Sequence, residues 1–204
     1  LSERQDVDPK RIATVGHSEG GIVTMLAAAR DRRIAALALV ATPGVTGAEL
    51  NLEQVKHALD RTNRSAADKQ ATIELQKKIQ QAVLTGTGWE GLAAYRRQAD
   101  TPWFQSFLAF DPATVMRDIR QPLLVVQGEL DTQVALSNAE RLEALASQRK
   151  NRPAAQVVRI RGVNHLLVPA TTGEADEYPT LADKRVSADV SRAIAGWLQT
   201  TFAK

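Results

Sequence analysis

Residues 11–21 read RIATVGHSEGG, and they indicate more about the architecture than any other segment of the 204-residue chain. The apolar run from Arg11 to Val15, introduced by Asp8-Pro9, is typical of a short strand. A glycine-rich turn follows over Gly16 to Gly21, and apolar residues then recur at helical spacing, at Ile22, Met25, Leu26 and Ala29. The segment therefore predicts a strand, a tight turn and a helix in direct succession.

Three further apolar runs are typical of parallel strands that are covered on both faces. These runs are Ile34 to Ala41, Leu123 to Val126 and Ala155 to Ile160. Helical patterns lie between and after them, over Ser137 to Gln148 and along the stretch that contains Val186, Val190, Ile194 and Trp197. Strands that alternate with helices predict the α/β class, with a parallel sheet and flanking helices.

The interval from Val45 to Asp118 differs in character, because no strand-like run occurs in it. Its first part holds helical stretches rich in Gln, Lys and Ala, over Ala66 to Leu84 and Trp89 to Ala99. An aromatic segment follows, with Trp103, Phe104, Phe107 and Phe110. We therefore predict one domain over residues 1–204 that carries a helical insert over residues 45–118, between two strands of the sheet.

The composition limits the kinds of partner and chemistry that we expect. Hydrophobic residues make up 44% of the chain and charged residues 24%, which is ordinary for a single globular unit. No run approaches the roughly 18 apolar residues that a membrane-spanning helix needs. The net charge is +3, but the cations are scattered among acids, so we expect no nucleic-acid partner. The absence of cysteine excludes disulfides and thiolate chemistry.

Gly16-His17-Ser18-Glu19-Gly20 fits the pattern G-x-S-x-G, in which a serine stands on a sharp turn between a strand and a helix. The glycines are needed because larger side chains would collide with the backbone of the turn, and their small size opens the approach to the serine hydroxyl. We therefore predict that Ser18 is a nucleophile. The alternative is a tight turn that carries no chemistry.

A serine hydroxyl is a weak nucleophile at neutral pH, so it needs a general base, and the base needs a third group that fixes its tautomer. In this architecture the chain order is serine, acid, histidine, with each residue after its own strand. The acidic positions Glu129 and Asp131 follow the strand at 123–126, and His165 follows the last strand. Either carboxylate could hold the imidazole, and we favour Asp131 because it reaches further into the loop.

Only three histidines occur, so the base can be sought by elimination. His17 lies inside the turn beside Ser18, where we expect a packing role with the ring pointing away from the nucleophile's face. His57 lies on the insert, where a surface role is expected. His165 lies in a loop after a strand, with Gly162 nearby, and it is the predicted general base; a structural histidine is the alternative.

The oxyanion that forms during acyl transfer needs hydrogen-bond donors. One donor would be the backbone N–H of Glu19, the residue after the nucleophile, at the start of a helix whose dipole favours negative charge. The second donor normally comes from a loop after an early strand, and this sequence offers no such loop. No metal or organic cofactor is implied, since acyl transfer through serine needs none.

At these positions the sequence resembles the α/β-hydrolase superfamily, and within it the EstD-type bacterial esterases, distant relatives of dienelactone hydrolases and prolyl-oligopeptidase-like enzymes. The matching segments are Asp8 to Ile12, Gly16 to Gly21, Ala41 to Gly47, Trp103-Phe104, Phe110 to Pro112, Gly128 to Asp131 and Asn164 to Leu166. The resemblance implies a carboxylic ester hydrolase that works through an acyl-serine intermediate on a small-molecule ester, with a Ser18-Asp131-His165 triad. A thioesterase or a peptidase of the same fold would use the same three residues.

By the same resemblance, the four predicted strands look like the fifth to eighth strands of an eight-stranded sheet. The insert looks like the helical cap that shapes the acyl pocket in such esterases. Trp103, Phe104 and Phe107 are then candidates for pocket residues, and a plain core role is the alternative.

The first four strands of that fold have no counterpart here, which would leave the strand at Ile12 to Val15 as an unpaired edge. We therefore expect a fragment, or one part of a split assembly whose edge pairs with a missing N-terminal half or a complementary chain. For the isolated polypeptide we expect weak activity or aggregation. The alternative function is accordingly a non-catalytic product with a structural role.

Overall fold

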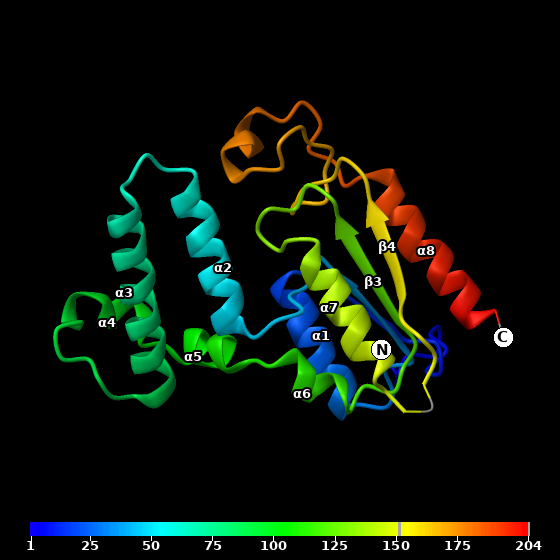
Figure 1. Cartoon of the computed structure of the whole chain (residues 1–204). Helices are drawn as coiled ribbons and strands as arrows, with labels where there is room; N and C mark the ends of the chain where they lie inside the picture. Colours follow the sequence, from blue (N-terminus) through cyan, green and yellow to red (C-terminus); the bar gives the residue numbers. More distant parts are fainter. Residues whose placement is uncertain (151, 204) are drawn as a thin grey trace. The chain divides into compact units, whose positions relative to one another are not determined.

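The fold is seen in a computed structural model that describes residues 1–150 and 152–203. The chain divides into two compact units. The sheet unit comprises Leu1–Gly44 and Pro112–Lys204, and the helical unit comprises Val45–Asp111. Figure 1 shows strands and helices in the first unit and helices alone in the second.

The sheet unit is built on four parallel strands (Figure 1). They are β1 (Ala13–His17), β2 (Ala36–Val40), β3 (Leu123–Gly128) and β4 (Gln156–Ile160), and they lie side by side in that order. In the register, Ala13 lies opposite Ala36, Leu37 opposite Leu123, and Leu124 opposite Gln156. All four carboxyl ends therefore lie along one edge of the sheet, where loops can bring distant residues together.

The four strands predicted from the apolar runs are confirmed. β2 and the apolar part of β3 are buried throughout, because every side chain over 36–40 and 123–126 is exposed by 1% or less. Burying one Leu or Val side chain to this extent contributes about 1.5–3 kcal/mol relative to leaving it exposed. β1 continues beyond its predicted end at Val15, because His17 still pairs with Val40.

Helices cover both faces of the sheet (Figure 1). One face carries α1 (Glu19–Arg30) and α7 (Ser137–Ser147), with α6 (Pro112–Met116) packed against both helices, and the other carries α8 (Ala188–Phe202). Trp197 and Val190 of α8 join Ala38 and Val126 of the sheet in one buried cluster. A short 3-10 helix, η1 (Ala175–Thr180), lies in the connection between β4 and α8. The predicted α/β class is therefore confirmed.

β1 forms an outer edge of the sheet. Within the described part of the chain it pairs with β2 alone. Its side chains are less covered than those of the central strands, since Val15 is 51% exposed. Thr14 Oγ1 is buried and has no hydrogen-bond partner among the described residues. The outer side of β1 therefore offers backbone groups that another strand could pair with.

The helical unit holds α2 (Gly47–Asp60), α3 (Ala66–Thr85), α4 (Ala93–Ala99) and α5 (Pro102–Ala109). Side-chain caps explain where the first two helices begin. Thr46 and Glu49 form a reciprocal capping box at α2, and the Ser65 side chain caps α3. α3 ends at Gly86, whose φ of 73° lies in the left-handed region that glycine adopts readily. The buried core consists of Ile79, Ala82, Val83, Trp89, Leu92 and Leu108.

The helical unit begins at Val45, where the sequence predicts the start of the insert, and it ends at Asp111 rather than at Asp118. The residues from Pro112 onward belong to the sheet unit, because α6 packs against α1 and α7. The sequence does not reveal this boundary, since α6 simply continues the helical character of the insert. Over residues 1–150 and 152–203, none of the helices combines the length and the apolar character that crossing a membrane would require.

Candidate active site

The turn that carries Ser18 joins β1 directly to α1. β1 ends at His17 and α1 begins at Glu19, so a single residue between them redirects the chain. The backbone of Ser18 has φ 55° and ψ −121°, outside the regions that residues with a side chain normally occupy. Such a conformation costs about 1–3 kcal/mol and persists only where the surrounding structure enforces it, which is common at functional sites. The predicted strand, tight turn and helix are confirmed.

At two of the glycines around Ser18 there is no room for a larger side chain. A β-carbon on Gly16 would lie 2.1 Å from the carbonyl oxygen of Gly20, and one on Gly21 would lie 1.9 Å from Thr42 Oγ1. A β-carbon on Gly20 would meet nothing within 4 Å. Gly16 and Gly21 therefore allow the close approach of strand, helix and loop that the turn requires, whereas Gly20 does not serve this purpose.

The predicted acid and the predicted base are in contact. His165 Nδ1 lies 2.9 Å from Asp131 Oδ2, and the two side chains are 9% and 0% exposed. An ionised carboxylate only accepts hydrogen bonds, so Nδ1 carries the proton and donates it to Asp131. In the neutral imidazole this leaves Nε2 unprotonated, which is the tautomer that a general base requires.

The Asp131 carboxylate accepts further hydrogen bonds that fix its orientation. Gln127 Nε2 donates to Oδ2 at 2.9 Å. The backbone N–H groups of Gln133 and Val134 donate to Oδ1 at 3.0 and 2.8 Å. Gln127 is itself buried at the end of β3 and also donates to the carbonyl oxygen of Val134 at 2.8 Å. These bonds satisfy a charge that would otherwise be costly to bury.

Glu129, the competing carboxylate, does not take part in this network. Glu129 is exposed, and within the described ranges its side chain forms no hydrogen bond or ion pair with His165. Its backbone N–H donates to the carbonyl oxygen of Ile160 at 3.0 Å, which continues the pairing of β3 with β4. Of the two carboxylates, the structure thus brings only Asp131 to the imidazole.

His17 contacts the loop that carries His165. Its Nε2 lies 2.7 Å from the carbonyl oxygen of His165, and the centroids of the two rings are 4.9 Å apart. Because a carbonyl oxygen only accepts, His17 Nε2 must carry a proton. The packing role expected for His17 is therefore incomplete, since the side chain also forms a hydrogen bond to the loop of the candidate base.

This contact brings Ser18 and His165 into the same neighbourhood, because His17 directly precedes Ser18. Within residues 1–150 and 152–203, the Ser18 hydroxyl makes no hydrogen bond to His165. Catalytic hydrogen bonds of this kind are often long before substrate binds and tighten in the complex. Glu19 is the first residue of α1, so its backbone N–H lies at the positive end of the helix dipole.

Sequence reasoning missed the loop over residues 171–178. The Glu177 carboxylate accepts hydrogen bonds from the backbone N–H groups of Thr171, Thr172 and Gly173, at 2.7, 3.0 and 2.9 Å. These donors, Thr171 foremost, lower the pKa of Glu177 to about 2. The loop is thus folded around one ionised side chain.

The same loop docks against the loop that carries the acid. Thr132 Oγ1 donates to the carbonyl oxygen of Gly173 at 3.2 Å, and Gln133 Nε2 donates to the hydroxyl of Tyr178 at 2.7 Å. A β-carbon on Gly173 would lie 1.7 Å from the carbonyl oxygen of Leu130. Gly173, whose φ is 79°, is therefore the one sequence signal that marks this close approach.

The other residues singled out in the sequence lie in the helical unit. His57 is half-buried in α2. The rings of Trp103, Phe104 and Phe107 stack with centroid distances of 5.8–6.4 Å, and Trp103 is 57% exposed. The acyl-pocket role that the resemblance implies for these aromatic residues stays a prediction. Across the described ranges, no group of three His, Asp or Glu side chains is arranged to hold a metal ion.

Comparison with known proteins supports the fold. The model of the alpha/beta hydrolase family matches residues 1–177. The structure of DcsB in complex with a substrate analogue is 21% identical, with a TM-score of 0.54 over 100% of this chain and 68% of DcsB. The alpha/beta hydrolase GrgF from Penicillium sp. sh18 is 19% identical, with a TM-score of 0.53 over 100% of this chain and 68% of GrgF.

An esterase from Pyrococcus furiosus is 11% identical, with a TM-score of 0.50 over 96% of this chain. The chain spans only 55% of the length of that esterase. No curated protein matches the sequence. Similarities to solved structures at these identities concern the fold alone. The family match, in contrast, extends over most of the chain and includes Ser18, Asp131 and His165. The chain therefore belongs to the alpha/beta hydrolase family.

Proposed function

We propose that this chain is a serine hydrolase that cleaves small-molecule carboxylic esters through an acyl-serine intermediate. Ser18 is the nucleophile, His165 is the general base, and Asp131 orients the base. The observation that carries the proposal is the 2.9 Å hydrogen bond between His165 Nδ1 and the buried Asp131 carboxylate. A fold of this kind hosts many chemistries, so the assignment rests on these side chains and on the strained turn at Ser18.

In the first half-reaction, Ser18 Oγ attacks the carbonyl carbon of the ester while its proton passes to His165 Nε2. The Asp131 carboxylate stabilises the imidazolium that forms and does not itself take the proton. When the tetrahedral intermediate collapses, the bond to the alcohol oxygen breaks, and His165 returns the proton to the departing alkoxide. The acyl group then remains on Ser18 as an ester.

In the second half-reaction, water attacks the acyl-serine carbonyl carbon and gives one proton to His165 Nε2. Collapse of this intermediate breaks the bond to Ser18 Oγ, which takes the proton back from His165. The products are an alcohol and a carboxylic acid, and the enzyme returns to its starting state.

The oxyanion in both steps needs stabilising donors, and we assign one of them to the backbone N–H of Glu19 at the start of α1. We assign the second donor to a segment that pairs with the outer side of β1, from an N-terminal half or a complementary chain outside the 204 residues. The support is that β1 leads directly into Ser18 and that Val15 on it is 51% exposed. A non-catalytic half that only pairs through this edge is the alternative function.

Labelling with a fluorophosphonate probe tests the proposal, because such probes react with serines that a base has activated. We expect the wild-type chain to be labelled and Ser18→Ala to be unlabelled. Ser147→Ala is the matched control, since Ser147 is exposed on α7 and donates only to the carbonyl oxygen of Ala144. Full ester turnover by a folded Ser18→Ala variant would refute the proposal, and an unlabelled but folded wild type would favour the non-catalytic alternative.

The leaving group is a separate question, because thioesters and amides can be cleaved by the same three residues. We expect p-nitrophenyl acetate to be hydrolysed faster than an acetyl thioester or an acetyl p-nitroanilide. Equal or greater kcat/KM for the thioester or the anilide would reassign the chain to thioesterases or peptidases while leaving the roles of Ser18 and His165 in place.

A further inference from the structure

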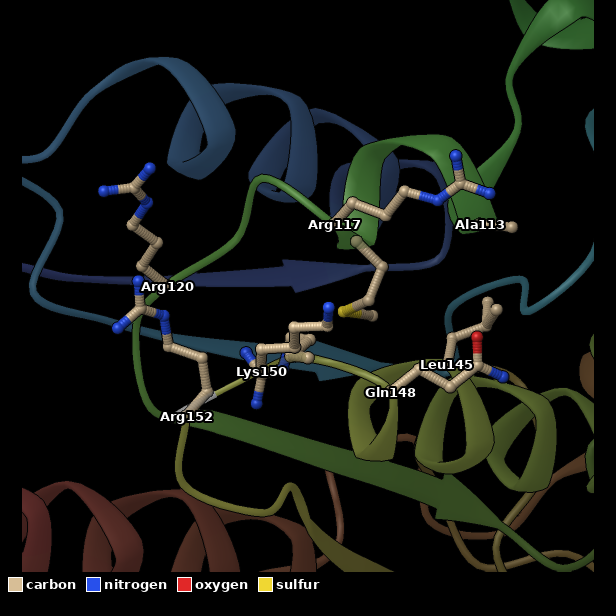
Figure 2. Close-up of a pocket in the computed structure, with 9 residues that line it drawn as sticks. Ala113, Arg117, Arg120, Leu145, Gln148, Lys150 and Arg152 are labelled. Atoms are coloured by element: carbon tan, nitrogen blue, oxygen red, sulfur yellow. The ribbon is translucent and has the colours of Figure 1, made fainter.

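A pocket of about 330 Å³ opens at the amino ends of β3 and β4, and positive charge dominates its lining. Five of its nine lining residues are cations and none is an acid. The cations are Arg117, Arg120, Arg149, Lys150 and Arg152. All of them except Arg149 are labelled in Figure 2. Ser18, Asp131 and His165 all follow the carboxyl ends of strands, so this pocket lies at the opposite edge of the sheet.

The fold assembles this pocket from two connections that are distant in the sequence. Arg117 and Arg120 lie between α6 and β3, and the other three cations lie between α7 and β4. Because β3 and β4 are neighbouring parallel strands, both connections enter the sheet at the same edge. Charges that look evenly scattered along the sequence are thereby concentrated around one cavity.

Arg149 carries a buried charge that no carboxylate neutralises within the described residues. Only 8% of the residue is exposed. Its guanidinium donates to the backbone carbonyl oxygens of Ala146, Gln121 and Pro153, at 3.1, 3.1 and 2.9 Å. Burial, followed by repulsion from Arg152, lowers the pKa of Arg149. A negative charge in the pocket would stabilise the charged form of Arg149 and so oppose both effects.

Three of the exposed cations around Arg149 also lack a partner of opposite charge among the described residues. Within residues 1–150 and 152–203, the side chains of Arg117, Arg120 and Lys150 form no ion pair. In other parts of this surface, arginines do find carboxylates, as Arg33 does with Asp31. These three cations are therefore not neutralised within the described residues. The cavity that they line has a volume at the lower end of the range of small-molecule sites, about 300–1,000 Å³.

We propose that this pocket binds the oligophosphate group of a small molecule, at a site distinct from the candidate active site. Guanidinium groups pair with phosphate oxygens in a bidentate manner, which makes arginine the preferred residue for such ligands. In the view of Figure 2, Arg120 and Arg152 lie on one side of the pocket and Arg117 on the other. Cations spread in this way suit a chain of phosphates better than a single phosphate.

Isothermal titration calorimetry with sodium tripolyphosphate tests the site directly. At about 0.15 M salt, where exposed charges are largely screened, we expect one site that binds tripolyphosphate at least roughly tenfold tighter than orthophosphate. In the Arg117→Gln/Arg120→Gln double variant, we expect the affinity for tripolyphosphate to fall about tenfold or more, because charged hydrogen bonds to the phosphates are lost.

The matched control removes an equal amount of positive charge at other positions of the sheet unit. Arg30 at the end of α1 and Arg161 after β4 are both exposed and do not line the pocket. Arg30→Gln/Arg161→Gln should bind tripolyphosphate as the wild type does. Equal weakening in both double variants would show a general charge effect and overturn the proposal, and so would equal affinity for orthophosphate and tripolyphosphate.

The Ser18→Ala variant separates this proposal from the proposed function. It should bind tripolyphosphate unchanged, because Ser18 lies at the other edge of the sheet. Loss of esterase activity with retained tripolyphosphate binding is the expected pattern. Loss of tripolyphosphate binding in Ser18→Ala would place the ligand in the candidate active site and contradict the assignment to the cationic pocket.

Discussion

His17 Nε2 donates a hydrogen bond to the backbone carbonyl oxygen of His165 over 2.7 Å. The residue that precedes the candidate nucleophile thus contacts the backbone of the candidate base, although the two are distant in the sequence. The bond joins the end of β1 to the loop after β4, although β1 and β4 are not neighbours in the sheet. It involves only the backbone of His165, so Nδ1 can bond to Asp131 and Nε2 stays available for the role that we propose for it toward Ser18.

Removing this bond should misplace the imidazole without removing any group that reacts. For His17→Ala we expect kcat to fall about tenfold to a hundredfold with little change in KM, because small displacements of a catalytic group have effects of this size. His17→Gln, which keeps a donor of similar reach, should recover part of the loss. Steady-state kinetics with p-nitrophenyl acetate would measure this, and an unchanged kcat in His17→Ala would contradict it.

Asp131→Asn should reduce kcat on the order of 10³-fold or more, because an amide no longer selects the tautomer with Nε2 unprotonated. Glu129→Gln is the matched control, since Glu129 is exposed and follows the same strand. We expect its kcat to stay within a few-fold of wild type. The opposite ranking of the two variants would transfer the orienting role to Glu129.

Gly21→Ala should destabilise the fold by about 1–3 kcal/mol, the usual cost of forcing an extra methyl group into a packed site. The reason is that the new β-carbon would lie 1.9 Å from Thr42 Oγ1. Gly20→Ala is the control, because its β-carbon meets nothing within 4 Å and alanine favours the helix. Urea denaturation of both variants gives the comparison, and equal stability would refute the packing argument.

The loop over 171–178 should loosen in acid. The folded-state pKa of Glu177 is lowered to about 2, below the value of about 4.3 for an unfolded chain. Its stabilising effect is therefore complete above about pH 4.3 and is lost as the pH falls toward 2. Carbon-13 NMR titration of the carboxyl group should give a midpoint near the lower value, and Glu177→Gln should increase amide exchange at Thr171 and Gly173 even at neutral pH.

The outer edge of β1 should promote self-association, because exposed strand edges pair readily with other strands. Val15→Lys introduces a charge on this edge and should reduce association, as measured by sedimentation velocity. Val186→Lys is the control, because both valines are 51% exposed but only Val15 lies on a strand. If both variants behave alike, the association does not run through β1.

Much of the sheet could be predicted because its central strands are buried on both faces and so read as uninterrupted apolar runs. Asp131 and His165 could be predicted as partners because loops after parallel strands leave the sheet at one edge. The bond from His17 to His165 and the fold of the loop around Glu177 could not, since each depends on a contact that no local pattern records. The same holds for the cationic pocket, whose charges are mixed with acids along the sequence.

Leu37 lies opposite Leu123 in the register of β2 with β3, although the whole helical unit separates them in the sequence. The stretch from Val45 to Asp111 is therefore inserted in the sequence between two strands that are neighbours in the sheet, and it has its own hydrophobic core. Such an insert is suited to replacement by protein engineering. We expect that a helical segment of another length can replace it while the strand order, and with it the geometry of Asp131 and His165, is retained.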